Sequence, residues 1–561
     1  MEPKSVTDID LSPLPGKRYT SFDREWREEF IYFLMVDRFH DAQPRQPQRH
    51  AQRTPGLAAP DNAFYGGKIK GITQNLDYIA GLGCTALWLS PIFENTPNAY
   101  HGYSIFNYLN IDPNFGTKQD LIELVDRAHS FKRNGQPHPI RVILDVVINN
   151  SGDTWTYQQG FPNYSGQRFD FGAWREPVKP IPTELRNPEL YHRMGQIQNW
   201  DTDPEKQLGD LYGLKDFAND DTAQGSDLIN ILIKSYCYWI READIDGFRV
   251  DAIKHMNPLA CARFSSNIRE YAYSLGKRRF FLFGELATPD DDVIDRYIGP
   301  NTSLQNGPET VFFGIDSILD FKLAEGAGLP GIIKGLAGPR PLFDRLSAQH
   351  HRALNHAELG RYLVTFVDNH DSFWQPGGRI AHQAPDEQVI AAIGFLLCSL
   401  GTACIYYGTE QGFEGHGEDN DIREAMFDKA VPGRNLMNPD CRIYQEIAKI
   451  AGVMRGAEEL RFGRMYYRPI SGNGEDFGLP SGTDYTLAFS RVLYGSEVLV
   501  AFNVSGNHRR DCVLIDSTLN RKGGHLKFLY GDAGQVPVEV SQGGIAFVHL
   551  DLKPHQFVIL G

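Results

Sequence analysis

The chain has 561 residues, of which 41% are hydrophobic and 22% charged, and its formal net charge is −14. This length predicts two or three domains, and the composition is that of an ordinary globular protein. The acidic balance argues against nucleic acid or an anionic membrane as a partner, because both require basic surface.

Apolar runs typical of buried parallel strands alternate with amphipathic helices in the first 150 residues. Residues 30–36, 85–89 and 142–147 are the predicted strands. Residues 72–82 and a segment that Thr117 would cap carry apolar side chains at helical spacing. This alternation predicts βα units, a parallel sheet and right-handed crossovers.

The alternation stops after the third strand and then resumes. Residues 152–225 are aromatic, polar and rich in proline, and they are too long for a connecting loop, so we expect a small inserted domain. Further strands are predicted at 247–250, 280–283, near 312–315, at 363–367 and at 403–407, with a last helix over 439–455. Eight strands alternating with helices predict an α/β fold, a (β/α)8 barrel of residues 1–151 and 226–456.

After residue 456 the hydrophobic period changes from that of helices to two. Residues 486–490, 497–503 and 546–550 alternate like antiparallel strands, and glycine, asparagine and proline turns separate them. We therefore expect an all-β C-terminal domain of residues 457–561.

The cysteines and the N-terminus bear on the compartment. Seven scattered cysteines without a CxxC pair favour neither a disulfide framework nor a zinc site. The first residues lack the apolar stretch of a signal peptide, and no apolar run is long enough to cross a membrane. These features predict a soluble, cytoplasmic protein with no membrane partner.

Three carboxylates follow predicted strands: Asp251 after the fourth, Glu285 after the fifth and Asp371 after the seventh. In a barrel these strand ends converge on one face. Clustered carboxylates raise one another's pKa, so that one stays protonated, and a protonated Glu beside an ionised Asp is the pair that cleaves glycosidic bonds with retention. Arg249 points the same way as Asp251, and we expect it to lower the pKa of Asp251.

Each of these carboxylates has a simpler structural interpretation. A single Asp after a strand is more often a helix N-cap or an ion-pair partner than a catalytic group. Three in strand order, accompanied by Arg249 and two histidines, favour catalysis.

Several motifs occur in a fixed order: DVVINN (145–150), GFRVDAIKH (247–255), FGEL (283–286) and FVDNHD (366–371), with YHGY (100–103), LGDL (208–211) and IYYGTEQGF (405–413) in support. The set resembles the α-amylase family of retaining glycoside hydrolases and transglycosylases, from about residue 29 to the end. The resemblance implies a (β/α)8 TIM barrel, a small domain inserted after strand three, and a C-terminal antiparallel β-sandwich.

The resemblance also implies roles for individual residues. It makes Asp251 the nucleophile, Glu285 the general acid/base and Asp371 the stabiliser of the transition state. The implied substrate-binding residues are His101, Tyr103, Asn150, Arg249, Lys254, His255, His370, Asp419 and Arg423. Asn150 stands where most members have His, so we expect a different substrate or subsite preference.

The family commonly holds a structural calcium ion between the barrel and the inserted domain. Asn149, Asp210 and the backbone carbonyl of His255 fall at ligand positions, although calcium needs six to eight oxygens. The alternative is that Asn149 and Asp210 hydrogen-bond to backbone at the domain junction. No organic cofactor is implied.

The resemblance implies a retaining hydrolase that cleaves α-1,4-glucosidic bonds in maltooligosaccharides or related α-glucans. Alternatives are an intracellular α-glucosidase or transglycosylase on short α-glucosides and, more remotely, a catalytically inactive binding relative. The implied partner is an α-glucan or malto-oligosaccharide. Linkage, chain length, the balance of hydrolysis and transfer, and the oligomeric state stay open.

Overall fold

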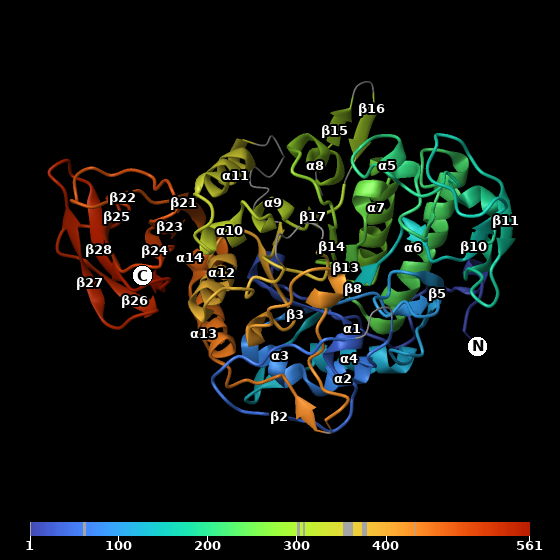
Figure 1. Ribbon diagram of the computed structural model, residues 1–561, viewed down its shortest axis with the longest axis horizontal. Coiled ribbons are helices and arrows are strands. Elements are labelled where there is room, and N and C mark those ends of the chain that lie inside the picture. Colours follow the sequence, from blue (N-terminus) through green and yellow to red (C-terminus); the bar gives the residue numbers. More distant parts are fainter. Residues whose placement is uncertain are drawn as a thin grey trace.

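A closed parallel β-barrel forms the centre of the molecule (Figure 1). The computed structural model describes residues 2–59, 63–299, 303–306, 309–312, 314–351, 363–372, 378–431 and 433–561. The barrel strands are β1 (Phe30–Leu34), β3 (Ala86–Leu89), β8 (Arg141–Val146), β13 (Gly247–Val250), β14 (Phe281–Gly284), β17 (Ser317–Ile318), β18 (Val364–Thr365) and β19 (Thr402–Tyr406). Their order in the sheet is β17-β14-β13-β8-β3-β1-β19-β18, and a parallel bridge between Leu319 and Val364 joins the two edges. The predicted (β/α)8 barrel is confirmed.

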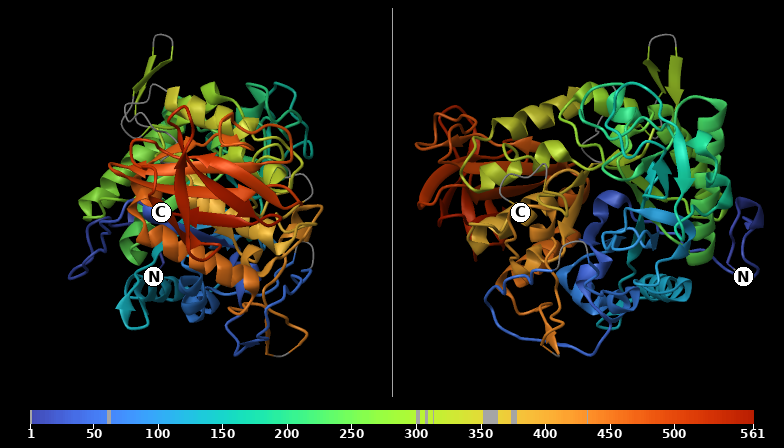
Figure 2. Two further views of the ribbon diagram at one scale, coloured as in Figure 1. Left: turned by 90° about the vertical axis from the view of Figure 1, so that its left-hand side faces the viewer. Right: turned by 45° about the vertical axis from the view of Figure 1, so that its right-hand side comes forward.

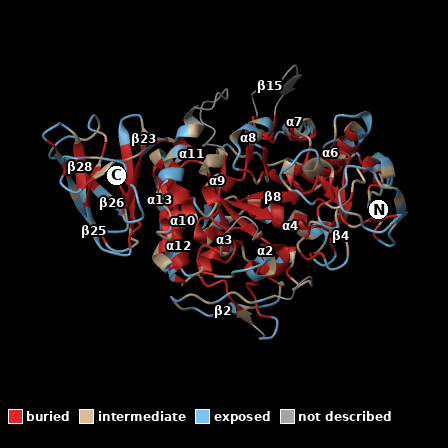
Figure 3. Ribbon diagram, turned by 45° about the horizontal axis from the view of Figure 1, so that its top comes forward, coloured by how far each residue is buried: buried red, intermediate tan, exposed pale blue. Residues whose placement is uncertain are grey.

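The barrel strands are apolar because both of their faces are covered. Every residue of β1, β3, β8, β13, β14 and β19 is buried, and buried ribbon fills the middle of the molecule (Figure 3). Parallel strands between barrel interior and outer helices have no solvent face, so their sequences are nearly continuous hydrophobic runs. The charged residues within these runs are Arg141, Asp145 and Arg249. Arg141 begins β8 and pairs with Glu29, whereas Asp145 and Arg249 lie near the carboxyl ends of β8 and β13, where a barrel carries its site.

Helices surround the barrel. They are α1 (Val36–Phe39), α2 (Ile69–Gln74), α3 (Leu76–Leu82), α4 (Lys118–His129), α6 (Ala223–Ala243), α7 (Pro258–Ser274), α8 (Asp291–Tyr297), α9 (Phe321–Ala324), α10 (Leu329–Ile333), α11 (Arg340–His351), α12 (Asp386–Cys398) and α13 (Arg442–Gly456). Thr117 caps α4 as predicted, because its side chain accepts a hydrogen bond from the Asp120 amide. Among the described residues, no helix combines the length and apolar character that crossing a bilayer requires.

Two predicted elements differ from the structure. The helix predicted over residues 72–82 is two helices, α2 and α3, which meet at Asn75. Strand six is β17, not residues 312–315: Phe312 ends β16 (Glu309–Phe312), which forms a projecting hairpin with β15 (Ser303–Asn306), and residue 313 lies outside the described residues (Figure 2). Strand β17 has two residues, one of them Ser317, and therefore no apolar run to mark it. The prediction was placed instead on the nearby apolar residues that begin in the hairpin.

The segment between β8 and α6 has its own small structure beside the barrel. Its strands are β9 (Asn150–Ser151), β10 (Trp155–Tyr157), β11 (Phe171–Trp174) and β12 (Lys215–Asp216), and its one α-helix is α5 (Glu205–Leu208). Strand β10 pairs with β11, and β12 pairs back to β9 at the barrel. Trp155 and Tyr191 are buried in this segment. The limits 152–225 for an inserted domain stay a prediction.

The C-terminal part is an antiparallel β structure at one end of the molecule (Figures 1 and 2). After α14 (Glu458–Phe462) it contains β21 (Arg464–Tyr467), β22 (Ile470–Ser471), β23 (Thr486–Leu493), β24 (Ser496–Asn503), β25 (Arg509–Leu514), β26 (His525–Tyr530), β27 (Gln535–Val540), β28 (Ala546–Leu552) and β29 (Phe557–Leu560). In its core, Leu499 of β24 and Val558 of β29 pack with Val513 of β25 and Val548 of β28. The predicted β-sandwich is confirmed, whereas its start at residue 457 stays a prediction.

Candidate active site

Arg249 is the centre of a carboxylate cluster at the carboxyl edge of the barrel. It is the next-to-last residue of β13 and is fully buried. Its Nη1 donates to Asp251 Oδ1 at 2.6 Å, and its Nη2 donates to Glu285 Oε2 at 2.7 Å. The Ala252 amide donates to the same Oε2 at 3.1 Å. One guanidinium thus holds two carboxylates that follow adjacent strands. The short distances are typical of charge-assisted hydrogen bonds.

A third carboxylate, Asp145, fixes Arg249 from β8. Its two oxygens lie 2.8 and 3.0 Å from Arg249 Nη1, and Oδ2 also accepts from Trp88 Nε1 at 3.1 Å. Sequence reasoning assigned Asp145 no role, although it stands in the DVVINN motif. The sequence does mark this residue, because a charged side chain within the apolar run of β8 needs a buried partner.

Tyr103 and His370 form one side of the site. Their rings stack with centroids 5.4 Å apart, and the Tyr103 hydroxyl lies 2.7 Å from His370 Nε2 and 3.0 Å from Asp145 Oδ2. The ring of His101 also stacks with Tyr103, with centroids 5.8 Å apart. Burial lowers the pKa of His101 to about 3 and that of His370 well below its ordinary value, so both imidazoles are neutral.

Arg423 brings Asp371 and Asp419 into the same site. Its Nη2 donates to Asp371 Oδ1 at 3.1 Å and to Asp419 Oδ2 at 3.0 Å, and its Nε donates to the His370 carbonyl at 2.8 Å. The other Asp419 oxygen accepts from the Ser372 amide at 2.7 Å. Asp419 and Arg423, although about 50 residues further along the chain, therefore contact the segment that follows strand seven.

The cluster contains more carboxylates than guanidinium groups, and it is buried. Burial raises the pKa of Asp371 to about 7, with Glu285 adding to the rise and Arg423 opposing it. Burial raises the pKa of Asp145 to about 6 against Arg249. It also raises the pKa of Asp251 well above its ordinary value: Arg249 lowers this pKa, as expected, but does not offset the effect of burial. Desolvation outweighs the guanidinium, and the site retains a proton near neutral pH.

Three predicted substrate residues lie outside the cluster. Asn150 is buried, and its only described side-chain bond runs from Nδ2 to the Ser151 carbonyl at 3.4 Å. Lys254 Nζ pairs with Asp201 Oδ1 at 2.6 Å. His255 Nδ1 lies 2.7 Å from the Lys206 carbonyl, and burial lowers its pKa to about 4. Lys254 and His255 thus tie the strand-four segment to the inserted segment.

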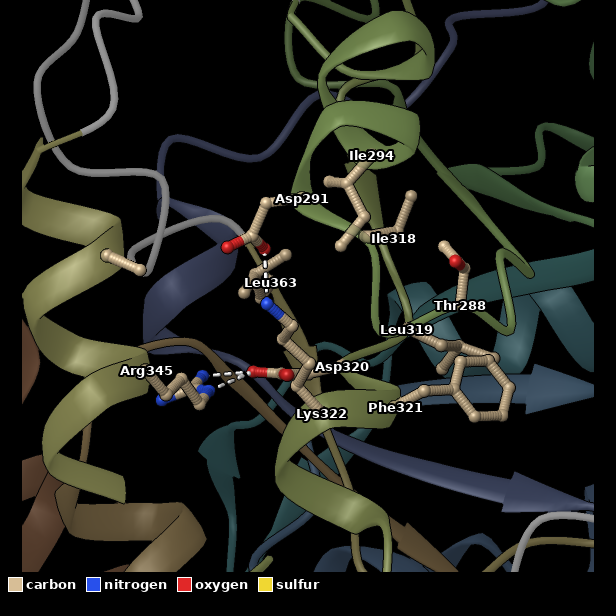
Figure 4. A pocket seen from close by; sticks show the side chains of 11 residues that line it. Thr288, Asp291, Ile294, Ile318, Leu319, Asp320, Phe321, Lys322, Arg345 and Leu363 are labelled. Carbon is tan, nitrogen blue, oxygen red and sulfur yellow. Dashed lines mark hydrogen bonds and ion pairs between the residues drawn. The ribbon is translucent and has the colours of Figure 1, made fainter. Parts of the chain in front are cut away.

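A small cavity near the end of β17 is not a sugar site. Its volume is about 20 Å³, roughly enough for one water molecule. Figure 4 shows the ion pairs that cross it: Arg345 Nε lies 2.9 Å from Asp320 Oδ2, and Lys322 Nζ lies 2.5 Å from Asp291 Oδ1. These are structural contacts between α8, α9 and α11.

The predicted calcium ligands already have protein partners. Asp210 Oδ2 accepts from the Tyr157 hydroxyl at 2.7 Å, and Oδ1 accepts from the Asp216 amide at 3.0 Å. Asn149 meets Asp216 rather than Asp210: its Nδ2 donates to Asp216 Oδ1 at 3.3 Å. The Oδ1 atom of Asn149 is buried without a hydrogen-bond partner, which leaves one oxygen at the junction for another donor or a cation.

A histidine supplies positive charge at this junction. His192 Nδ1 lies 2.6 Å from Asp216 Oδ2. Burial lowers the pKa of His192, but Asp216 and Asp220 outweigh it and raise the value to about 9. Within the described ranges, no group of three or more His, Cys, Asp or Glu side chains is arranged to hold a metal. The predicted ligands Asn149, Asp210 and the His255 carbonyl supply few oxygens, and both oxygens of Asp210 already accept hydrogen bonds from the protein, so these residues do not fit a cation that takes six to eight oxygens.

Stability should accordingly be independent of calcium. We expect the same melting temperature in excess EDTA, in calcium and in a magnesium control, because a cation that does not bind the folded state cannot stabilise it. Thermal unfolding followed by circular dichroism measures this. A melting temperature that rises saturably with calcium, and not with magnesium, would contradict the conclusion that these residues do not fit calcium.

The fold and the site together define a (β/α)8 barrel of the glycoside hydrolase class. A family model described as "Alpha amylase, catalytic domain" matches residues 33–437, and the chain belongs to this alpha-amylase family. The chain is 27% identical to an alpha-amylase of Streptomyces lividans over 551 residues, which cover 85% of this chain and 56% of the relative. It spans about half the length of the curated relatives that match it first.

Two solved structures share the fold over nearly their whole length. The alpha-amylase from Geobacillus thermoleovorans complexed with acarbose has a TM-score of 0.69 and 25% identity, and covers 96% of this chain and 99% of its own. A cyclomaltodextrin glucanotransferase with a three-domain ABC distribution has a TM-score of 0.68 and 26% identity, and covers 95% and 98%. The resemblance inferred from the motifs is confirmed.

Proposed function

We propose that the chain is a retaining α-glucan hydrolase that cleaves α-1,4-glucosidic bonds in maltooligosaccharides or related α-glucans through a covalent glycosyl–Asp251 intermediate. The observation that carries the proposal is the way Arg249 joins Asp251 and Glu285. Each carboxyl has one oxygen bound by the protein, and in the described part of the chain the other oxygen has no hydrogen-bond partner. Two free carboxyl oxygens are what a nucleophile and an acid need.

In the first step, Oδ2 of Asp251 forms a bond to the anomeric carbon while the bond from that carbon to the leaving oxygen breaks. The electron pair of the broken bond goes to the leaving oxygen, which takes the proton from Oε1 of Glu285. The products of this step are a glycosyl ester of Asp251 and a glutamate. Arg249 stabilises the charge of Asp251 before attack and of Glu285 after proton transfer.

In the second step, a water molecule gives its proton to Oε1 of Glu285, and its oxygen bonds to the anomeric carbon. The ester bond breaks, and its electron pair returns to the carboxylate of Asp251. Asp371 would accept hydrogen bonds from the sugar hydroxyls as the ring flattens. Tyr103, whose hydroxyl is held by His370 and Asp145, would supply an aromatic face against which the sugar packs.

A second candidate is an α-glucosidase or transglycosylase on short α-glucosides. The structural likeness to a cyclomaltodextrin glucanotransferase favours it. The same residues serve both outcomes, because either water or a sugar hydroxyl can release the glycosyl group. A catalytically inactive binding relative is disfavoured, since Asp251, Glu285 and Asp371 are all present in one site.

The test is incubation with maltooligosaccharides of graded length, with products separated by chromatography. We expect shorter maltooligosaccharides to accumulate. Products longer than the substrate would support the transglycosylase instead, and no turnover of any α-glucoside would overturn both enzymatic proposals.

A further inference from the structure

Arg379 is a fully buried arginine that none of the steps described above uses. Its Nε lies 2.6 Å from Oε2 of Glu424, whose side chain is 7% exposed. Its Nη1 donates to the Tyr407 carbonyl at 2.8 Å, and its backbone amide donates to the Gly415 carbonyl at 3.0 Å. Taking two charges out of water costs about as much as their attraction gains, so the place of this ion pair in the fold matters more than its strength.

The two residues that flank Arg423 are both fastened to the end of β19. The hydroxyl of Tyr406, the last residue of β19, donates to the Ile422 carbonyl at 3.2 Å. The hydroxyl of Tyr407 donates to the Glu424 carbonyl at 2.8 Å. The backbone on each side of Arg423 is therefore held by a buried tyrosine.

Arg379 packs on the same two tyrosines. Its guanidinium carbon lies 4.3 Å from the centroid of the Tyr406 ring and 5.3 Å from that of the Tyr407 ring. The Glu424 oxygen that Arg379 does not bind accepts from the Gly415 amide at 2.9 Å. Removal of Arg379 would thus leave Glu424 without its charged partner and both rings without the group that packs on them.

The position of the Arg423 backbone decides whether its guanidinium reaches Asp371. Nη2 of Arg423 donates to Asp371 Oδ1 at 3.1 Å, near the long end of the usual range, so a small displacement would break this hydrogen bond. The residue after Arg379 is tied to the strand-seven segment, because the Ile380 amide donates to Asp368 Oδ2 at 3.1 Å. Arg379 therefore joins the two segments that carry Asp371 and Arg423.

We infer that Arg379 and Glu424 are positioning residues for the reaction: they hold the backbone at Arg423 so that its guanidinium meets Asp371, and they affect turnover through Arg423. The inference rests on the proposed function, in which Asp371 binds the sugar as its ring flattens. The placement of such a group depends on the residues that pack behind it, and an error of about 1 Å costs much of the rate.

The ion pair of Arg141 with Glu29 provides a matched control. Its side chains are 1% and 0% exposed, and Arg141 Nε lies 2.8 Å from Glu29 Oε1. Arg141 begins β8, so the pair lies at the end of the barrel away from the catalytic strand ends. Arg141→Met should destabilise the protein as Arg379→Met does, and it should leave kcat within about twofold of the unsubstituted value.

The experiment is a double-mutant cycle of Arg379→Met, Arg423→Met and the double variant, with kcat and KM measured on maltopentaose. All measurements are made at a temperature at which circular dichroism shows each protein folded. We expect Arg379→Met to lower kcat about tenfold when Arg423 is present and less than about twofold in the Arg423→Met background, because the residue through which it acts is then absent. Tyr407→Phe removes one hydroxyl and keeps the ring, so it should show the same dependence on Arg423 with a loss of about threefold, even if Arg379→Met does not fold.

Equal losses of kcat with and without Arg423, or no loss in either variant, would overturn the inference. An unsubstituted protein that does not turn over maltopentaose would overturn the proposed function instead. Calorimetric binding of maltopentaose to the same proteins then decides the inference separately: non-additive losses of affinity support it, and additive losses or absent binding refute it.

Discussion

Asp251→Asn is expected to lose turnover by a factor on the order of 10⁴ or more on every α-glucoside, while the protein stays folded. The amide keeps the shape of the side chain and its oxygen can still accept from Arg249, which donates to Asp251 Oδ1 at 2.6 Å. The amide is not nucleophilic, so no glycosyl ester forms. Steady-state kinetics on maltopentaose and on α-glucosyl fluoride measure the loss.

Glu285→Gln is the matched control, since it removes the acid and leaves the nucleophile. Fluoride leaves without protonation, so this variant should keep far more activity on α-glucosyl fluoride than on maltopentaose. Asp251→Asn should fail on both. If Asp251→Asn kept near-normal activity on either substrate, Asp251 would not be the nucleophile.

Arg249→Met is expected to lower the free energy of unfolding by about 3–5 kcal/mol, because it leaves three carboxylates without their buried positively charged partner. The side chain of Arg249 is 1% exposed, and those of its partners Asp145, Asp251 and Glu285 are 0, 14 and 13% exposed. Methionine fills a similar volume, so a cavity contributes little. Urea unfolding at neutral pH measures the difference.

The sign of the pH dependence follows from the same contacts. Arg249 opposes the rise in the pKa of Asp251 and of Asp145, so its removal raises both pKa values further above the 3.8 of an ordinary Asp. The folded variant then holds protons that the unfolded chain releases, and its stability falls as pH rises. The deficit should be larger at about pH 8 than at about pH 5.

The control for this variant is Arg510→Met, which removes an exposed ion pair. Arg510 is 79% exposed and lies 2.9 Å from Asp551, itself 57% exposed. Its loss should change the free energy of unfolding by about 0.5 kcal/mol or less. If both variants lost the same free energy of unfolding, the buried ion pairs of Arg249 would stabilise the protein no more than an exposed ion pair does.

The barrel was predictable because its strands are continuous apolar runs that end in charged residues. Strand six was misplaced, since β17 has two residues and its sequence has no such run. Strand seven was placed correctly but is shorter than its apolar run, at Val364–Thr365. The bounds of such strands are defined by hydrogen bonds to neighbouring strands and not by the length of an apolar run. The sequence pattern therefore does not predict them.

Within the site, strand order predicted which carboxylates meet, and the structure brings Asp251, Glu285 and Asp371 to two arginines. The protonation balance was not predictable, since it depends on burial, which raises the pKa of Asp251 despite Arg249. The partner of Asn149 was also missed. Asp216 follows Asp210 by only six residues, and the pairing of β12 with β9 decides which one reaches the junction.

The central claim is a covalent intermediate on Asp251, and the stereochemistry of the first product tests it most directly. Proton NMR can follow the anomeric signals of newly formed ends while the unsubstituted protein cleaves maltopentaose. Two displacements at the anomeric carbon predict that the α-anomer forms first and the β-anomer appears later by mutarotation. Initial formation of the β-anomer would mean a single displacement by water and would contradict the account.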